Sequence, residues 1–407
     1  MKYNFDEIID RQHTNALNTD GFRGYIFHAG PEKKFNYADD EFVRMWVADM
    51  EFGVAPEILD AIRHRLDKKI LGYTLMYDPT YYDIFLNWCK TRYDWTFPRE
   101  ELTFSPGVIP ALYQLVEDLV AKDEKVLTMT PAYGFFLHAC EYNNVELVHN
   151  DLKHENGHFT IDFDLLDQQA SDPKVKLLLL CNPHNPSGRI WTVEELKKIA
   201  EIVEKYDLWV ISDEIHCDIV RCNNRHTPLG KVMPDYKKLV TCMSASKSFN
   251  MAGLMFSHII IRDAEERAHF IARDKTIGDL NPLSIAAHKA AYEQGGPWLE
   301  EMKAYLDENF RTLKEFLDAN LPEAVFEIPE ATYLAWVDMK GCLPGMSDED
   351  MCSFFANEAG VLLEGGDHLF VGNAAGFIRL NLAMPRSIIM IGLTRIKAAI
   401  DRRENRR

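Results

Sequence analysis

Between about residue 100 and residue 262, short apolar runs alternate with segments of helical periodicity. The apolar runs lie at 126–130, 176–181, 208–211, 238–243 and 258–261. Continuous apolar runs of this length are typical of strands that are covered on both faces of their sheet. The alternation therefore predicts an α/β chain in which a mostly parallel sheet lies between helices.

The segments between these runs carry clear helix signals. Residues 108–119 place apolar side chains at i, i+3, i+4 and i+7, which predicts an amphipathic helix. Thr192 and Glu195 have the spacing of a capping box, so we expect a second helix to begin there.

The pattern changes after about residue 285. A long helical segment at 298–317 precedes a strand-like run at 333–337, a helix at 348–359, a strand at 377–382 and a charged terminal helix. This mixture predicts a smaller α+β domain, and 407 residues are enough for two domains. We expect an N-terminal segment at 1–45 packing with the small domain, a large domain at 46–290 and the small domain at 291–407.

The net charge of −18 excludes some partners. Nucleic acids and anionic lipid surfaces attract clustered cations, so neither is expected to bind this chain. No apolar run approaches the length that crosses a bilayer. The eight cysteines form no Cys-x-x-Cys pair, which favours reduced thiols and a cytoplasmic location.

Four polar segments follow strands of the predicted sheet. They are SPG at 105–107, NPHNPSG at 182–188, SDEIH at 212–216 and SASK at 244–247. Open α/β sheets bind ligands outside the carboxyl ends of their strands, so these segments are the candidate site.

Each segment has an ordinary interpretation as well as a functional one. Lys247 is either a solvated loop lysine or a desolvated amine that forms a Schiff base with an aldehyde. Asp213 either caps a turn or accepts a hydrogen bond from a protonated pyridine nitrogen and keeps that nitrogen cationic. The SPG segment is either a tight turn or a helix N-terminus that binds phosphate.

Taken together and in this order, these motifs resemble the class I/II aminotransferase superfamily, the fold-type I pyridoxal-phosphate enzymes. MWVADMEF at 45–52, GYT at 72–74, DEIH at 213–216 and SKSFN at 246–250 further resemble the cystathionine β-lyase and cystalysin (MalY/PatB-like) C–S lyase branch. The resemblance implies a large domain with a mostly parallel, seven-stranded type of sheet between helices, and a smaller α+β domain. It also implies pyridoxal 5′-phosphate as cofactor and a homodimer with its active site at the subunit interface.

The resemblance also implies roles for individual residues. Lys247 holds the cofactor and removes the substrate's Cα proton, Asp213 pairs with the pyridinium nitrogen, and Tyr133 stacks on the ring. Asn185 and His216 bind the cofactor near O3′. The phosphate is bound by Gly107, Val108, Ser244, Ser246 and Tyr73 from a second subunit. Arg379 clamps the substrate carboxylate, and Asn185 and Ala48 also contact the substrate.

Two positions depart from the typical aminotransferase pattern. His216 stands where a tyrosine is usual, and Met255 stands where many members have a phosphate-binding arginine. The lyase branch resembles this chain at both positions, so we interpret the departures as support for that branch. How the phosphate is held without an arginine at 255 is left open.

No metal site is predicted. His149, His154 and His158 lie in an Asn/Gly-rich polar segment that is more typical of a turn between strands than of a set of ligands.

Three functions remain open from the sequence. The first is β-elimination from a sulfur amino acid, which yields a thiol, pyruvate and ammonia. The second is transamination with the same Lys247, Asp213 and Arg379. The third is a catalytically idle relative that serves as an interaction protein, against which the intact site residues argue.

Overall fold

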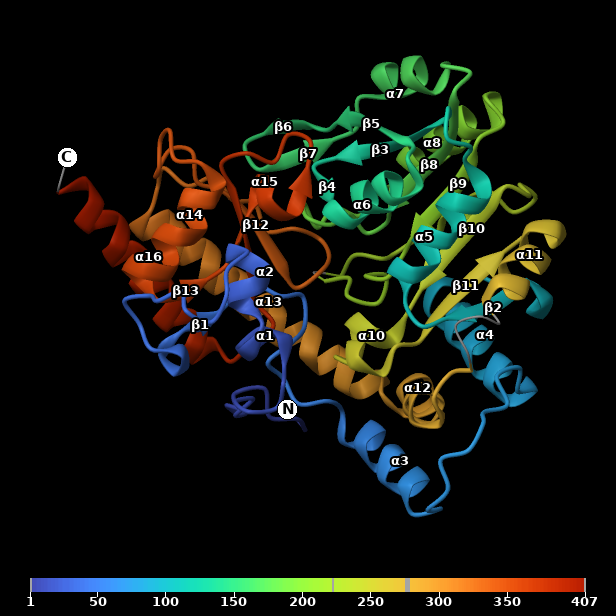
Figure 1. Cartoon of the computed structure of the whole chain (residues 1–407), viewed down its shortest axis with the longest axis horizontal. Helices are drawn as coiled ribbons and strands as arrows, with labels where there is room; N and C mark the ends of the chain where they lie inside the picture. Colours follow the sequence, from blue (N-terminus) through green and yellow to red (C-terminus); the bar gives the residue numbers. More distant parts are fainter. Residues whose placement is uncertain (1, 222, 275–278, 406–407) are drawn as a thin grey trace.

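The structure is a computed structural model that describes residues 2–221, 223–274 and 279–405. Its main sheet has seven strands, which are in spatial order β2 (Leu102–Ser105), β11 (Ser257–Ile261), β10 (Leu239–Met243), β9 (Trp209–Asp213), β8 (Val175–Cys181), β3 (Lys125–Thr130) and β5 (Glu146–Asp151) (Figure 1). Strand β11 is antiparallel to both of its neighbours, and the other adjacent pairs are parallel. The predicted mostly parallel sheet is confirmed.

Strand β8 shows why its sequence is continuously apolar. Leu177 and Leu179 pack into a core cluster with helix α5 (Val108–Leu119), whereas Leu178 and Leu180 pack into a cluster with helix α8 (Val193–Lys205). Successive side chains of a strand point to opposite faces, so helices cover the sheet on both sides.

The remaining helices around the main sheet are α3 (Pro56–Leu66), α4 (Pro79–Tyr93), α6 (Gly134–Asn143), α7 (Phe163–Ala170), α9 (Leu229–Val232), α10 (Ala245–Ser248), α11 (Ala264–Asp274) and α12 (Pro282–Gln294), with short turns η2 (Arg99–Glu101) and η3 (Ala252–Leu254). The capping box of α8 is confirmed. The Glu195 N–H donates to Thr192 Oγ1 at 3.1 Å, and the Thr192 N–H donates to Glu195 Oε2 at 2.8 Å.

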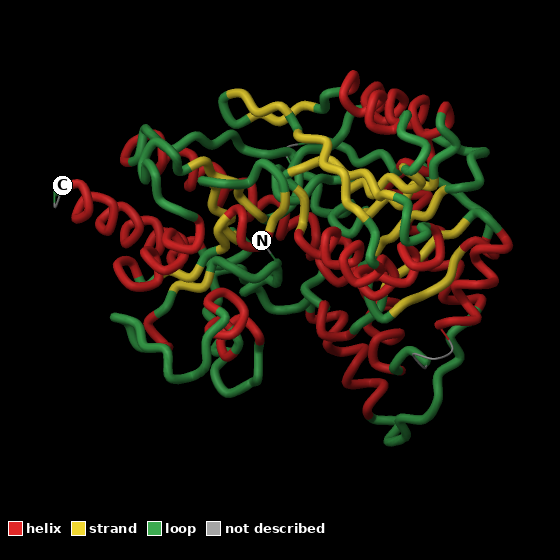
Figure 2. The backbone as a smooth tube through the Cα atoms, turned by 45° about the horizontal axis from the view of Figure 1, so that its top comes forward, coloured by secondary structure: helices red, strands yellow, loops and turns green. Residues whose placement is uncertain are grey.

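A second region lies beside the main sheet, and both regions mix helices with strands (Figures 1 and 2). It contains the sheet β12 (Leu334–Asp338), β16 (Phe377–Asn381) and β14 (Glu364–Gly365), with α14 (Asp348–Phe354), η4 (Phe355–Ala359), α15 (Gly366–Leu369) and α16 (Arg386–Glu404). The single helix predicted at 348–359 is therefore two segments. Its second part, η4, is a wider π-type turn that ends at Gly360, whose φ of 60° suits glycine.

Three pairs of short strands complete the structure. They are β1 (Val43–Arg44) with β13 (Val361–Leu362), β4 (Ala132–Tyr133) with β15 (Phe370–Val371), and β6 (Lys153–Glu155) with β7 (His158–Thr160). The last pair is a hairpin whose turn contains Asn156 and Gly157, both with positive φ. The predicted turn among the three histidines is confirmed.

Helix α13 (Gly296–Asn320) joins the two regions, and Figure 1 shows it running between α12 and α16. Its first half packs Trp298 and Leu299 into a core cluster with α4 and α12. Its second half packs Phe310 and Leu313 against β12 and α16. One rigid helix therefore sets the position of the small sheet relative to the large one.

The N-terminal segment contacts both regions. It contains the short helices α1 (Leu17–Asp20), α2 (Phe22–Phe27) and η1 (Asp39–Glu41). Phe22 of α2 and Phe42 pack into the core cluster of the small sheet. Tyr3 and Phe5 instead pack into the cluster that holds Trp298 and α4. The domain boundaries at 45/46 and 290/291 stay a prediction.

Within the described part of the chain, none of the helices combines the length and the apolar character needed to cross a membrane.

Candidate active site

A cavity of about 200 Å³ opens where β8, β9 and β10 end and where α5 begins. Strands that run parallel end at one edge of the sheet, so polar residues distant in sequence meet there. The cavity brings together most of the residues predicted from the sequence, namely Ala48, Gly107, Val108, Tyr133, Asn185, Asp213, His216, Ser246, Lys247 and Arg379.

Lys247 lies on α10, one short turn after β10. Ser244 caps this turn, since its Oγ accepts a hydrogen bond from the Ser246 N–H at 3.1 Å. Lys247 Nζ donates to the carbonyl of Ala48 at 2.7 Å. Burial lowers the pKa of Lys247 to about 8, although Asp49 nearby favours the charged form. The amine is therefore available without a proton at mildly alkaline pH.

Asp213 is the last residue of β9 and is only 6% exposed. One of its oxygens accepts a hydrogen bond from the Ile215 N–H at 3.1 Å. Burial raises the pKa of this carboxyl to about 7, and the nearby Lys247 opposes the shift only partly. A cationic ligand nitrogen placed against Asp213 would restore the ionised form.

Asn185 and His216 leave polar atoms unpaired inside the protein. Both side chains are buried, and neither Asn185 Oδ1 nor His216 Nδ1 has a hydrogen-bond partner. Burial lowers the pKa of His216 to about 3, and the Lys247 cation acts in the same direction, so the imidazole is neutral. Buried polar atoms without partners are rare in folded proteins and point to a ligand that pairs with them.

Arg379 lies in the middle of β16 and is 1% exposed. Its Nη2 donates to the carbonyl of Trp46 at 2.9 Å. Its Nε and Nη1 have no partner. A buried guanidinium with two free donors is suited to a planar anion such as a carboxylate.

The segment at 45–52 closes one side of the cavity because several side chains hold its backbone. Asn250 accepts from the Met50 N–H at 2.9 Å and donates to the carbonyls of Met50 and Phe52. The Tyr333 hydroxyl donates to the carbonyl of Ala48 at 2.8 Å. Ala48 is thereby fixed at the position where its carbonyl meets Lys247. No local sequence pattern indicates the part that Tyr333 plays, since Tyr333 and Ala48 lie 285 residues apart along the chain.

Tyr133 is held on the opposite side by the pairing of β4 with β15, where Tyr133 faces Phe370 in the register. Burial raises the pKa of its phenol, so the hydroxyl keeps its proton. The sequence also missed Cys181 and Ser257, which complete the lining from β8 and β11.

Two predicted residues lie outside this cavity. The Ser244 hydroxyl donates to the carbonyl of Phe256 at 2.7 Å and caps α10, so it is committed to the local backbone. Tyr73 is 100% exposed in the loop between α3 and α4. A phosphate-binding role for these two residues stays a prediction.

The N-terminus of α5 and Ser246 also line the cavity. Met255, where many related enzymes are expected to have arginine, is 59% exposed. Among the described residues that line the cavity, the cations are Lys247 and Arg379. Backbone N–H groups at the start of α5 are therefore the main donors that this chain offers to a phosphate.

The residues of the cavity fit pyridoxal 5′-phosphate. A lysine of lowered pKa suits its aldehyde, a buried carboxyl suits its ring nitrogen, and a helix N-terminus suits its phosphate. The unpaired atoms of Asn185, His216 and Arg379 are the observation that most clearly calls for a polar ligand.

Comparisons with known proteins agree with this fit. The model of the family "Aminotransferase class I and II" matches residues 43–396. Cystathionine beta-lyase PatB of Bacillus subtilis is 39% identical over 360 residues, which are 88% of this chain and 92% of that protein. A PLP-bound C–S lyase of Staphylococcus hominis, solved with the inhibitor L-cycloserine, is 47% identical with a TM-score of 0.93, and 98% of each chain is covered. Cystalysin from Treponema denticola, whose structure contains pyridoxal 5′-phosphate, is 32% identical with a TM-score of 0.91 over 99% of this chain and 100% of that one.

Proposed function

The chain belongs to the aminotransferase class I and II family, and from this membership we propose that it is a pyridoxal-phosphate-dependent carbon–sulfur lyase. The reaction is α,β-elimination from L-cystathionine, L-cysteine or a cysteine S-conjugate. It breaks the Cβ–S bond and yields a thiol, pyruvate and ammonia. The similarity to relatives that are named cystathionine beta-lyase and C–S lyase supports elimination over other reactions of the family.

One observation carries the proposal. A lysine whose pKa is lowered to about 8 and an arginine with two free donors line the same cavity. The first group suits proton transfer, and the second suits the α-carboxylate of an amino acid. An amino acid held by Arg379 would place its Cα within the space that Lys247 also faces.

Bound in this cavity, pyridoxal phosphate supplies an electron sink that stabilises negative charge at the Cα of an amino acid. Lys247 Nζ, once free of its proton, removes the proton from Cα as general base. The hydrogen bond from Nζ to the Ala48 carbonyl fixes the direction of the amine. Lys247 then holds that proton as an ammonium group while the thiolate leaves Cβ.

The other residues of the cavity set orientation and charge. Arg379 binds the substrate carboxylate through its guanidinium N–H groups, since Nε and Nη1 have no partner in the protein and Nη2 donates only to the Trp46 carbonyl. Asp213, ionised, pairs with the ring nitrogen and keeps that nitrogen protonated. The neutral His216 and the amide of Asn185 hydrogen-bond the ring substituents without adding charge.

The charge of the cavity bears on the substrate. Apart from Lys247 and Arg379, the described lining contains no lysine or arginine. A transaminase specific for dicarboxylic acids needs a further cation for the second carboxylate, and none is found among the described residues that line the cavity within one chain. The distal end of cystathionine carries one amino group and one carboxylate, so its net charge is zero.

The first experiment supplies L-cystathionine to the purified holoenzyme without any keto acid. The proposal expects steady pyruvate release over many turnovers, because elimination regenerates the enzyme in each cycle. An aminotransferase would stop after one equivalent of product per active site, which would contradict the lyase assignment. If the purified protein has no yellow colour and does not react with borohydride, the result would support the third interpretation, a catalytically idle relative that serves as an interaction protein.

We also propose a homodimer in which Tyr73 enters the partner's active site. The loop between α3 and α4 carries five exposed large hydrophobic side chains, Ile70 (73%), Leu71 (59%), Tyr73 (100%), Leu75 (72%) and Tyr77 (43%). Apolar side chains gathered on one exposed loop are typical of a surface that another chain covers. Tyr73 would then donate its phenol hydroxyl to the cofactor phosphate, because position 255 holds a methionine and supplies no arginine for that phosphate.

Subunit complementation tests this arrangement. Lys247→Ala and Tyr73→Ala homodimers each lack one component of every site. After the two proteins are mixed and allowed to exchange subunits, a hybrid dimer contains one intact site if Tyr73 acts across the interface. Activity should then rise to about a quarter of the wild-type value, since about half of the dimers are hybrids with one intact site of two. Activity that stays at the level of the parent variants would contradict the shared site.

A reducing compartment such as the cytoplasm fits the thiols of the chain. The seven described cysteines are buried, and Cys222 lies outside the described residues. Burial raises the pKa of Cys181 and Cys242, so these thiols are protonated and weak nucleophiles.

A further inference from the structure

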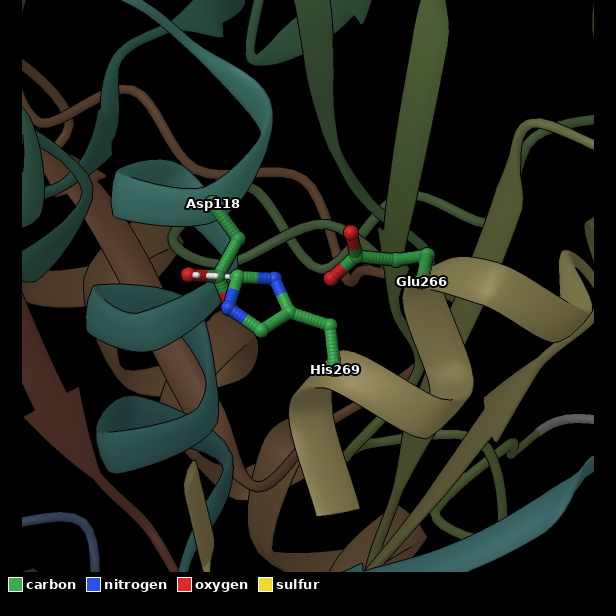
Figure 3. A group of neighbouring side chains, drawn as sticks. All are labelled: Asp118, Glu266 and His269. Atoms are coloured by element: carbon green, nitrogen blue, oxygen red, sulfur yellow. Dashed lines mark ion pairs between the residues drawn. The ribbon is translucent and has the colours of Figure 1, made fainter. Parts of the chain in front are cut away.

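Asp118, Glu266 and His269 form a side-chain cluster on the outside of the main sheet, away from the cavity. Asp118 lies in the last turn of α5, and Glu266 and His269 lie on the same face of α11, as i and i+3. Figure 3 shows the three side chains pointing toward one another from these two helices. One ligand atom from each lies within 4.8 Å of the others.

The carboxylates of this cluster are buried with unpaired oxygens. The Asp118 side chain is 1% exposed, and Glu266 is 9% exposed. Asp118 Oδ2 and Glu266 Oε1 have no hydrogen-bond partner. A buried carboxylate oxygen without a donor is costly, so this pair of oxygens is poised for a cation.

The surrounding charges also favour a cation. Asp118 and Glu117 lie at the carbonyl end of α5, where the helix dipole already disfavours negative charge. Arg273 pairs with Asp118 Oδ1 and with Glu117, so it neutralises part of this charge. It leaves Asp118 Oδ2 and Glu266 Oε1 without a hydrogen bond, and Asp263 adds a further negative charge nearby.

We propose that Asp118, Glu266 and His269 bind a divalent transition-metal ion, with zinc as the best match. Two carboxylates and one imidazole are a donor set that zinc accepts, with water in the remaining position. The His269 side chain is 54% exposed, so water reaches the site. The ion joins the end of α5 to α11 and stabilises their packing.

The spacing of the ligand atoms is compatible with this geometry. In tetrahedral coordination, two atoms bound to one zinc ion at about 2.0–2.2 Å lie about 3.3–3.6 Å apart. The separation of His269 Nδ1 from Asp118 Oδ1 is 4.0 Å, which Figure 3 marks with a dashed line. The ligand atoms of the three residues lie within 4.8 Å of one another, so side-chain rotations that bring them about 1 Å closer would complete the ligand set.

The test is a calorimetric titration of the holoenzyme with zinc chloride, without amino acids in the buffer. The wild type should bind one zinc ion per chain with saturation, and its thermal transition should rise when zinc is present. Glu266→Gln, which keeps the shape but loses a charged oxygen, should weaken this binding at least about tenfold. His269→Ala should do the same.

His149→Ala is the matched control, because it removes another exposed histidine and should leave the zinc site unchanged. A second titration with magnesium chloride tests the role of the imidazole, since magnesium prefers oxygen ligands and should bind far more weakly. The proposal is overturned if the wild type shows no saturable zinc binding. It is also overturned if Glu266→Gln and His269→Ala bind zinc as the wild type does, or if magnesium binds equally well.

Discussion

Asp213 and Glu214 are adjacent residues at the end of β9, and both are buried, yet their surroundings differ completely. The Glu214 carboxylate accepts from Ser212 Oγ at 2.8 Å and from the Leu229 N–H at 2.9 Å, and it lies 2.7 Å from His226 Nε2. Asp213 has the Ile215 N–H and otherwise faces the cavity. Glu214 is thus a structural carboxylate, whereas Asp213 is left for a ligand.

The two fully buried arginines repeat this contrast. Arg221 donates to the carbonyls of Thr332 and Pro329 and pairs with Asp307 at 3.1 Å. Arg379 has one carbonyl partner and two nitrogens without any. Satisfied polar groups hold the framework, and unsatisfied ones identify the place where a ligand completes the hydrogen bonds.

The largest effect is expected for Lys247 when it is compared with its neighbour Ser248. Lys247→Ala removes the general base and should lower kcat/KM for pyruvate release by at least about 10³-fold. Ser248→Ala removes a hydrogen bond from Ser248 Oγ to Asp218 and should lower the free energy of unfolding by about 1 kcal/mol with little change in kcat/KM. Steady-state assays and urea denaturation separate the two results. More than a tenth of wild-type activity in Lys247→Ala would contradict the assignment of the base.

A second pair of variants separates Asp213 from Glu214. Glu214→Ala leaves Ser212, His226 and the Leu229 N–H without their partner, so the free energy of unfolding should fall by about 3 kcal/mol. Asp213→Asn should leave the apoprotein at least as stable as the wild type while kcat decreases. Urea denaturation of both apoproteins measures the difference. Equal destabilisation by the two changes would break the comparison.

The third pair replaces each buried arginine by lysine. Arg379→Lys loses the two-point contact with the substrate carboxylate, so kcat/KM should fall about 10–100-fold, mainly through a higher KM. Arg221→Lys should leave KM unchanged and lower the free energy of unfolding by about 1–3 kcal/mol. A KM that rises equally in both variants would show that Arg379 acts through stability alone.

The sequence predicted the fold well because its signals are local. Apolar strand-length runs, the capping box at Thr192 and the amphipathic pattern of α5 each need only a few consecutive residues. The residues that follow strands β8, β9 and β10 met at one edge because parallel strands require it. The functional roles assigned to them stay a prediction.

Other features depend on contacts that no local pattern encodes. The phosphate-binding role of Ser244 stays a prediction; a serine before a short helix is equally suited to cap it, and the Ser244 hydroxyl accepts from the Ser246 N–H in this way. The contact of Tyr333 with Ala48 joins segments 285 residues apart. The cluster of Asp118 with Glu266 likewise depends on how α11 packs against α5.

Glu364 is a further residue of this kind, and it lies next to the site. In the register of β14 with β16 it is directly opposite Arg379, and it is 1% exposed with Oε2 unpaired. Burial raises the pKa of Glu364 to about 7, and the Arg379 cation opposes this shift. The carboxyl is therefore mostly neutral at pH 6 and mostly ionised at pH 8.

The smallest predicted effect is the change that Glu364→Gln makes in the pH dependence of KM. Above pH 7 an ionised Glu364 offsets part of the charge of Arg379, so the wild-type KM should rise severalfold between pH 6 and pH 8, whereas the KM of the variant should change less. Because the folded pKa of about 7 exceeds the unfolded value of 4.5, Glu364 costs the folded state stability as the pH rises from 4.5 to 7. Glu364→Gln should therefore be more stable than the wild type at pH 8 and equal to it at pH 4, as measured by urea denaturation. If KM rises equally with pH in both proteins, Glu364 does not tune Arg379, and the unpaired atoms of Arg379 alone determine how the carboxylate binds.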